Sequence, residues 1–561
     1  MQKNNRTIIV IGLLLVCFGG FLHSLMYSPY MVDDAYITFR YAENLSNGHG
    51  LSYNIPKQLE GYSNPLLLLL LSSGIKAGIS PPLLAQLIGV ISFLSLIILC
   101  FLCDERINGS SKFAIIPPLL IASCAACAYW SVAGLETLLH TLLLTVCVYF
   151  AIQKTPTIKN AKYQTILFTV ALILLIISRT EGALLAIVIA LIHSFNNHQY
   201  NNDNEKLCHN NEKSENDNEK LCHNRDKSKW SKLSAFAIPL TVIIVAIIFH
   251  GLRLLWFGTL SSGPAIAKLA GSIAPLSEGL HYSYSFVKDF LPSLFIMTIV
   301  FSVAVWGPVS PYLITIAICQ FAIVLFIGGD WMVFYRMYIP VLPLISLEIS
   351  RLIKYLIELN SKLKYPALAL LLISVLKLMT IPIATKQEII RYKAKNDLMT
   401  EISKDLRKTY KKHCSLAIGD IGVIGYKTNY TIIDMKGLVS PWICDSYKII
   451  KEKNYLRTTL DTNLIFDKEP DLMLIAIEPA NLTKSKIPTK KINLTKVKGF
   501  WSCDMSLLDN DRLVKQYILM KQYKGKKPLF LDYLLFQKRT KHLATSNPDK
   551  LLMEENKNEQ I

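Results

Sequence analysis

The sequence predicts a polytopic α-helical membrane protein that ends in a soluble α/β domain. Its 561 residues are 52% hydrophobic and have a positive mean hydropathy of +0.34. Apolar runs of about 20 residues, the length that crosses a bilayer as a helix, recur through the first two thirds of the chain. From about residue 386 the composition becomes hydrophilic. We therefore expect a membrane domain over 1–385 and a soluble domain over 386–561.

The first apolar run, 7–28, is long enough to span the bilayer and lacks the cleavage site of a signal peptide, which favours an anchor. Residues 29–80 then form an outer loop with interfacial helices, because the apolar stretch 65–79 is short for a span. Without that stretch, the sequence predicts about eleven spans. The ten after the first cover 82–103, 113–131, 134–152, 163–179, 181–195, 233–252, 286–304, 309–327, 338–357 and 365–385.

Lysine and arginine in short loops predict the orientation, since they favour the cytoplasmic side. They occur before the first span and in three later loops, at Lys3, Arg6, Arg106, Lys112, Lys154, Lys159, Lys162, Arg351, Lys354, Lys362 and Lys364. All of these share one side only if 65–79 does not cross the membrane. We therefore expect the N-terminus inside and the C-terminal domain outside.

Residues 196–232 are a polar insert in which NDNEKLCHN occurs twice, at 202–210 and 216–224. Its Cys-His doublets suggest metal binding, but a polar, asparagine-rich duplication is more typical of disorder. We interpret the insert as a disordered cytoplasmic loop.

The C-terminal domain has short apolar runs that predict strands at Ser415–Ile418, Thr431–Ile433, Leu472–Ile477 and Leu529–Phe536. It holds 33 Lys+Arg against 21 Asp+Glu, a net +12 of the whole-chain +19. Such a charge suits anionic headgroups or phosphorylated glycans, although solubility alone also explains it. It has no glycine-rich phosphate loop, and we expect it to cover the site as a carbohydrate-contacting lid. Nucleic acid is not an expected partner.

Polar clusters occur at the outer ends of several predicted spans. Two adjacent carboxylates, Asp33 and Asp34, follow the first span, where ionisable residues are functional candidates. A helix cap is the simpler alternative for such a doublet. The other candidates, which we expect to bind substrate, are Arg40, Glu60, Tyr62, Asn64, Glu136, Arg179, Glu181, Arg253, Lys268, Asp330 and Arg336.

These residue types suit glycosyl transfer from a lipid-phosphate sugar. Arginine and lysine bind phosphate, and fixed cations stabilise a leaving phosphate. A carboxylate removes the proton from the acceptor hydroxyl as its oxygen attacks the anomeric carbon. Asp33 is the first candidate for this base, because it lies nearest the first span, and Asp34 is the second. Helical spacing places Ile37 and Arg40 on the same face as Asp33.

The motifs DDAYITFRYAENLSNGHGLSYN, EGYSNP, GLET, RTEG and GGDWMVFYRMYIPVLP, in this order, resemble the bacterial C-type (GT-C) membrane glycosyltransferases of the LphB kind. The mycobacterial terminal arabinofuranosyltransferase is similar. The resemblance implies a GT-C-like fold in a bacterial inner membrane, with the site and the C-terminal domain facing the periplasm. It also implies a polyprenyl-phosphate sugar donor, an inverting mechanism and an aspartate base, here Asp33 or Asp34.

The expected acceptor is a cell-envelope glycan such as lipopolysaccharide, and the expected surroundings are membrane lipids. The sequence indicates no metal ligands and no certain cofactor, and leaves a divalent cation open. Two other functions remain as alternatives. One is a flippase or transporter of lipid-linked sugars, and the other is an oligosaccharide polymerase or ligase.

Overall fold

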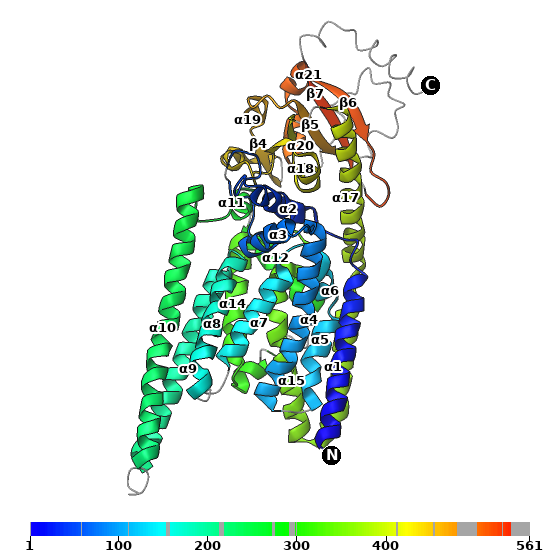
Figure 1. Cartoon of the computed structure of the whole chain (residues 1–561). Coiled ribbons are helices and arrows are strands. Elements are labelled where there is room, and N and C mark those ends of the chain that lie inside the picture. Colours follow the sequence, from blue (N-terminus) through cyan, green and yellow to red (C-terminus); the bar gives the residue numbers. More distant parts are fainter. Residues whose placement is uncertain are drawn as a thin grey trace.

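A bundle of helices and an α/β domain above one end of it make up the structure (Figure 1). The computed structural model describes residues 2–57, 59–109, 112–152, 158–211, 218–271, 275–290, 298, 300–410, 413–452, 455–478, 502–529 and 531–539. The N-terminus lies at the end of the bundle that is far from the domain (Figure 1).

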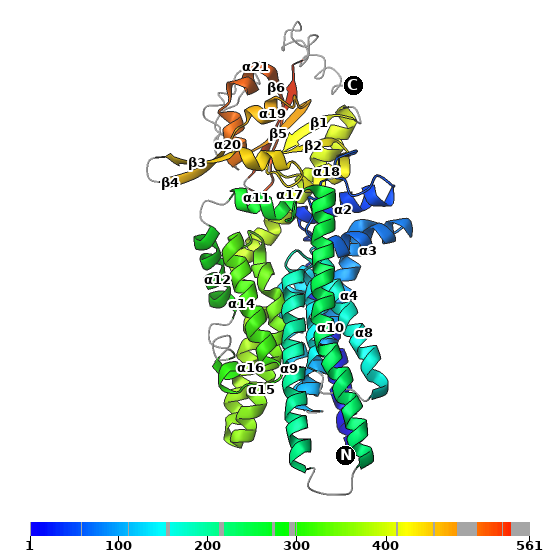
Figure 2. The ribbon, with the colours of Figure 1, turned by 90° about the vertical axis from the view of Figure 1, so that its left-hand side faces the viewer.

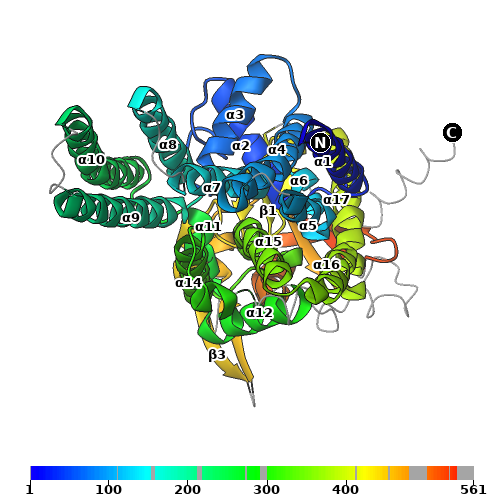
Figure 3. The same ribbon diagram turned by 90° about the horizontal axis from the view of Figure 1, so that it is seen from below.

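The bundle is built from apolar helices that run side by side (Figures 1 and 3). Their buried side chains, Phe93, Trp130 and Leu344 among them, form one continuous hydrophobic core. The helices are α1 (Gln2–Leu25), α4 (Pro81–Asn108), α5 (Ile116–Ser123), α6 (Ala125–Val132), α7 (Thr137–Ala151), α8 (Ile158–Ser178), α9 (Gly182–Asn211), α10 (Asn218–Phe257), α12 (Pro275–Phe290), α14 (Ser310–Ile327), α15 (Leu342–Leu359) and α16 (Lys364–Met379), with the 3-10 helices η1 (Lys112–Ile115), η2 (Val333–Val341) and η3 (Ser361–Leu363).

Five stretches of the described helices are long and apolar enough to span a membrane. The number is six if one bent pair of helices counts as a single span. The pair, predicted as one span at 113–131, bends by 58° at Cys124, whose extended backbone interrupts the helix. Four further apolar helices are shorter, so the total of about eleven stays a prediction. The five spans are Arg6–Leu25, Pro81–Asn108, Phe236–Phe257, Ser310–Ile327 and Ser361–Thr409.

Two helices after α1 lie across the end of the bundle, beneath the α/β domain (Figure 1). They are α2 (Asp33–Ser46) and α3 (Pro65–Lys76). With 12 residues, α3 is roughly 18 Å long, which is short for a hydrocarbon core of about 30 Å. This length agrees with the expectation that 65–79 does not cross. The location of both helices at a membrane surface stays a prediction.

The structure places helix in the polar insert, where the sequence predicts disorder. Helix α9 continues to Asn211 and α10 begins at Asn218, so both extend from the bundle into residues 196–232. Each prolongs an apolar helix of the bundle, which spares it the cost of helix nucleation. Residues 212–217 lie outside the described residues.

A five-stranded sheet of order β2-β1-β5-β7-β6 forms the centre of the C-terminal domain. Strands β2, β1 and β5 are parallel, and β7 runs antiparallel to β5 and β6. A hairpin of β3 and β4 projects from the domain (Figure 2). The elements are α17 (Ile383–Thr409), β1 (Ser415–Ile418), α18 (Gly422–Thr428), β2 (Thr431–Asp434), η4 (Pro441–Ser446), β3 (Tyr447–Glu452), β4 (Tyr455–Leu460), α19 (Asn463–Phe466), β5 (Leu472–Ile477), α20 (Ser502–Leu508), α21 (Asp511–Gln516), β6 (Tyr517–Tyr523) and β7 (Asp532–Lys538).

Three of the four predicted strands occur where the sequence indicates them, as β1, β2 and β5. The fourth, predicted at 529–536, begins at Asp532, because a turn at Lys527 and Pro528 precedes it. Helix α17 runs without interruption across the predicted boundary at 385, so it connects the membrane part to the domain.

The segment around α2 shares a hydrophobic core with the C-terminal domain. Ile37, Tyr41 and Tyr53 pack into the same cluster as Ile418 and Val423. Polar contacts reinforce this packing. The Asn54 side chain accepts a hydrogen bond from the Ile432 amide at 2.9 Å and donates one to the Ile432 carbonyl at 2.7 Å. It therefore binds the β2 backbone in the way that the backbone of a neighbouring strand would. The domain is therefore docked firmly on this segment.

Candidate active site

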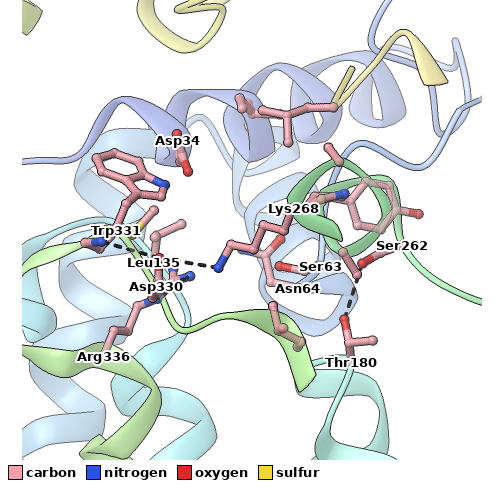
Figure 4. Close-up of a pocket in the computed structure, with 18 of the residues that line it drawn as sticks. Asp34, Ser63, Asn64, Leu135, Thr180, Ser262, Lys268, Asp330, Trp331 and Arg336 are labelled. Atoms are coloured by element: carbon pink, nitrogen blue, oxygen red, sulfur yellow. Dashed lines mark hydrogen bonds and ion pairs between the residues drawn. The ribbon is translucent and has the colours of Figure 1, made fainter. Parts of the chain in front are cut away.

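A cavity of about 930 Å³ lies where the bundle, α2 and the C-terminal domain meet (Figure 4). Its wall includes most of the residues singled out in the sequence. The predicted residues that line it are Asp33, Asp34, Tyr62, Asn64, Glu136, Arg179, Glu181, Lys268, Asp330 and Arg336. The C-terminal domain contributes Lys395, Gly419, Asp420, Ile421, Lys436, Leu438 and Cys503, none of which the sequence analysis predicted.

Asp34 is the second residue of α2, and its carboxylate faces the cavity (Figure 4). Within the described residues, this carboxylate makes no hydrogen bond or ion pair. Burial raises the pKa of Asp34 to about 6, and the charge of Asp33 adds to the rise, while Arg336, Lys395 and Lys436 act against it. Asp34 is therefore poised to exchange a proton near neutral pH.

Asp33 has a different task. Its two carboxylate oxygens accept bonds from the amides of Gly422 and Val423, at 3.1 Å and 2.9 Å. These amides begin α18, where backbone N–H groups lack partners inside the helix. Only 6% of Asp33 is exposed. Asp33 thus caps the N-terminus of α18, a helix of the C-terminal domain. It does not cap its own helix, α2.

Asp330 holds two cations at the edge of the cavity (Figure 4). After α14, Gly328 and Gly329 adopt positive φ values of 84° and 85°, which glycine tolerates. The Arg336 guanidinium lies 2.8 Å from the Asp330 carboxylate, and the Lys268 ammonium lies 3.4 Å from it. Burial raises the pKa of Asp330, but Arg336 and Lys268 outweigh burial and hold this pKa well below its usual range. The carboxylate stays ionised and positions both cations.

A chain of hydrogen bonds crosses the cavity floor. Thr38 donates to Asn64 at 3.1 Å, and Asn64 donates to Glu136 at 2.8 Å. Arg179 then bridges two carboxylates, at 2.8 Å from Glu136 and 2.6 Å from Glu181. This chain of hydrogen bonds joins residues from four predicted motifs, and its carboxylates are hydrogen-bond acceptors.

A second cation cluster comes from the C-terminal domain. Asp420 accepts from the Lys395 ammonium at 3.3 Å, the Lys436 ammonium at 3.1 Å and the Tyr533 hydroxyl at 2.7 Å. Burial raises the pKa of Asp420, but the two lysines outweigh burial and hold this pKa well below its usual range. Asp420 and Lys436 follow the carboxyl ends of the parallel strands β1 and β2, where ligands often bind in α/β sheets. Applied to the predicted strands, this rule could have identified Asp420 and Lys436 from the sequence.

Three residues predicted to bind substrate do not line the cavity. Arg40 donates to the carbonyls of Gly425 and Tyr430 at 2.8 Å and 2.7 Å, so it holds the far end of α18. Glu60 and Arg253 form an ion pair at 2.9 Å, with side chains only 4% and 3% exposed. This pair connects the segment before α3 to α10.

Within the described residues, no group of three or more histidine, cysteine, aspartate or glutamate side chains lies close enough to hold a metal ion. The cavity chemistry among these residues is that of carboxylates, lysines and arginines.

An apolar bundle, a charged cavity at one end and an α/β domain above it make up the fold of a polytopic membrane protein, and solved structures of ArnT share this fold. Two crystal structures of ArnT from Cupriavidus metallidurans are similar to the chain at 9% sequence identity. The structure without ligand has a TM-score of 0.51 and aligns over 98% of this chain and 99% of that chain. The structure bound to undecaprenyl phosphate has a TM-score of 0.50 and aligns over 95% and 98%.

An archaeal oligosaccharyltransferase, AglB from Archaeoglobus fulgidus, aligns at 10% sequence identity over 77% of this chain and 64% of its own, with a TM-score of 0.42. Residues 387–540 match a domain family described as of unknown function, DUF8728. A search of curated protein sequences found no match.

Proposed function

We propose that this protein is an inverting glycosyltransferase that moves a sugar from a polyprenyl-phosphate donor to a cell-envelope glycan such as lipopolysaccharide. It works at the periplasmic face of a bacterial inner membrane. The observation that carries the proposal is the Asp34 carboxylate, which has no hydrogen-bond or ion-pair partner in the described part of the chain and faces a cavity that cations also line. The ArnT fold, found with undecaprenyl phosphate bound, supports the choice of donor.

In the proposed reaction, Asp34 takes the proton of an acceptor hydroxyl while that oxygen attacks the anomeric carbon of the donor sugar. The bond from this carbon to the phosphate oxygen breaks, and the phosphate leaves with the electron pair. Asp34 replaces Asp33 as the first candidate because Asp33 already accepts two backbone bonds. With a pKa of about 6, Asp34 is ionised at neutral pH and is still able to hold the proton that it takes.

Lys268 and Arg336 are the proposed ligands of the donor phosphate. The Lys268 side chain is 30% exposed, so its ammonium can reach a ligand while it stays near Asp330. Apolar residues at the end of α14, namely Ala322, Ile323, Phe326 and Ile327, line the same cavity and suit the first carbons of a polyprenyl chain. The chain of hydrogen bonds that runs from the Asn64 side chain to the Glu181 side chain is proposed to bind sugar hydroxyls.

A transfer assay tests the proposal. The purified full-length protein in liposomes is incubated with a panel of undecaprenyl-phosphate sugars and extracted envelope glycan. The masses of the products are then measured by mass spectrometry. We expect free undecaprenyl phosphate and a glycan heavier by one sugar. Lys268→Gln should slow transfer about tenfold or more, because it removes a charged contact to the leaving group.

Two results would contradict the proposal. A ladder of added sugars would indicate a polymerase or ligase. Movement of the donor across the bilayer without a new glycosidic bond would indicate a flippase or transporter.

A further inference from the structure

The cavity wall includes an exposed tryptophan that the proposed function does not use. Trp331 directly follows Asp330 in the GGDW motif and lines the cavity (Figure 4). It is 55% exposed, whereas the Asp330 side chain before it is buried and Met332 after it is only 5% exposed. Ligand cavities are lined by aromatic side chains, and a large ring that stays open in one is suited to contact a ligand.

A second tryptophan near the same motif is built in a different way. Trp130 is fully buried, and its indole N–H donates to the Val333 carbonyl at 3.3 Å. The Arg336 guanidinium lies over its ring, 5.5 Å from the ring centre. Within the described residues, the Trp331 indole N–H makes no hydrogen bond. Trp130 therefore supports the site, whereas Trp331 offers it a ring and a hydrogen-bond donor.

One aromatic contact supports the Trp331 ring. It meets the ring of Tyr392 in α17, with the two ring centres 5.8 Å apart and an angle of 75° between the ring planes. In such an edge-to-face contact, Tyr392 covers at most one face of the indole. Tyr392 is itself buried. The indole is thus held from one side, which lowers the entropy that a ligand on its other face would have to overcome.

Helix α17 also connects Trp331 to the proposed base. One turn after Tyr392, the Asn396 side chain donates to the Met31 carbonyl at 2.7 Å. Met31 lies three residues before Asp34, and Asp34 and Trp331 line the same cavity (Figure 4). The contacts of α17 therefore fix the start of α2 and Trp331 at the same part of the cavity wall.

The residue before Trp331 holds the proposed phosphate ligands. The Asp330 carboxylate lies 2.8 Å from the Arg336 guanidinium and 3.4 Å from the Lys268 ammonium. In the donor, the sugar is bonded directly to the phosphate that these cations would bind. Its anomeric carbon must also come close to the acceptor oxygen at Asp34. The donor sugar therefore occupies the part of the cavity that Trp331 borders.

We propose that Trp331 is the platform on which the donor sugar packs. A sugar ring has C–H groups that pack against an aromatic face, and its hydroxyls can accept a bond from the indole N–H. This assignment rests on the proposed function. It narrows the donor class to sugars that have one ring face on which no hydroxyl interrupts the C–H groups.

Binding measurements test the assignment without any need for turnover. The full-length protein in phosphatidylcholine nanodiscs is titrated with a panel of undecaprenyl-phosphate sugars. The reference ligand is undecaprenyl methyl phosphate, a phosphodiester of the same charge without a sugar. Trp331→Leu keeps an apolar side chain but loses the aromatic face, and Trp331→Phe keeps an aromatic face. Trp306→Leu is the matched control, because Trp306 is 65% exposed and does not line the cavity.

We expect the wild-type protein to bind at least one sugar lipid about tenfold or more tightly than the methyl diester. Trp331→Leu should reduce this preference to less than about twofold, with the affinity for the methyl diester unchanged within about twofold. Trp331→Phe should keep most of the preference, and Trp306→Leu should keep all of it. An unchanged Tm in each variant checks that the protein stays folded.

Three results would overturn the assignment while the proposed function stands. The wild-type protein could bind all the lipids equally, or the preference for a sugar lipid could survive in Trp331→Leu. The third is an equal loss of affinity for the sugar lipid and the methyl diester, which would assign the indole to the phosphate or the polyprenyl chain. If the wild-type protein binds none of the lipids, the proposed function fails, and the assignment fails with it.

Discussion

Asp33 and Asp34 are adjacent in the chain, but their carboxylates point in different directions because successive helical residues are about 100° apart. Asp33 turns to the C-terminal domain and accepts bonds from Gly422 and Val423, whereas Asp34 faces the cavity. Asp33 therefore fits the helix-cap interpretation of the doublet, and Asp34 fits the catalytic interpretation.

The rate of transfer should depend on pH in one direction. A base works only as a carboxylate, so a pKa of about 6 for Asp34 predicts that kcat/KM falls about tenfold per pH unit below that value and levels off above it. The measurement is the initial rate from about pH 4.5 to about pH 8. Enzyme held at each pH and assayed at neutral pH controls for unfolding. A flat profile would contradict this role of Asp34.

At the scale of elements, α18 is held at both ends by α2. Asp33 binds the amides at its start, and Arg40 binds the Gly425 carbonyl and the Tyr430 carbonyl just beyond it. The sequence spacing correctly placed Asp33, Ile37 and Arg40 on one face. It gave no sign that this face meets α18, because the partners lie almost 400 residues further along the chain.

Asp33→Ala should loosen α18. The variant leaves two buried amides without acceptors, at a cost of about 1–3 kcal/mol. Hydrogen exchange of the amides at the start of α18 should become about tenfold or more faster. Asp467→Ala is the matched control, since Asp467 is in the same domain but 61% exposed. Unchanged exchange in Asp33→Ala would show that this cap is dispensable.

The buried pair of Glu60 and Arg253 should be a structural connection between α10 and the segment before α3. Arg253→Met leaves a buried carboxylate unpaired and should cost about 3–5 kcal/mol. The double variant Glu60→Leu/Arg253→Met removes both charges and should recover much of the lost Tm. If the double variant is as unstable as the single one, the pair has another role.

At the scale of the whole molecule, the cavity exists only where three parts of the chain meet. The sequence predicted the apolar helices, the α/β domain and most of the charged residues that line the cavity. It missed Lys395, Asp420 and Lys436, because single-sequence patterns do not reveal which loops of a separate domain return to a distant helix. It also assigned Arg40, Glu60 and Arg253 to substrate, since a charge that binds backbone or another side chain has the same sequence signature.

Removal of the C-terminal domain should abolish transfer. A chain that ends after α17 lacks Asp420 and Lys436, and it leaves Arg40, Tyr53 and Asn54 without their partners in the domain. We expect transfer below detection and rapid proteolysis between α2 and α3, measured in membranes that contain equal amounts of each protein. Full transfer by the shortened chain would refute the prediction that this domain is a lid over the site.

The central claim is that Asp34 is the base, and adjacent variants test it most directly. Asp34→Asn and Asp33→Asn make the same change in charge and volume at neighbouring positions. The account predicts that Asp34→Asn lowers kcat by about 10²–10⁴-fold with an unchanged Tm, and that Asp33→Asn lowers Tm while kcat falls less than about tenfold. Near-normal kcat in Asp34→Asn, or the larger loss of kcat in Asp33→Asn, would contradict it.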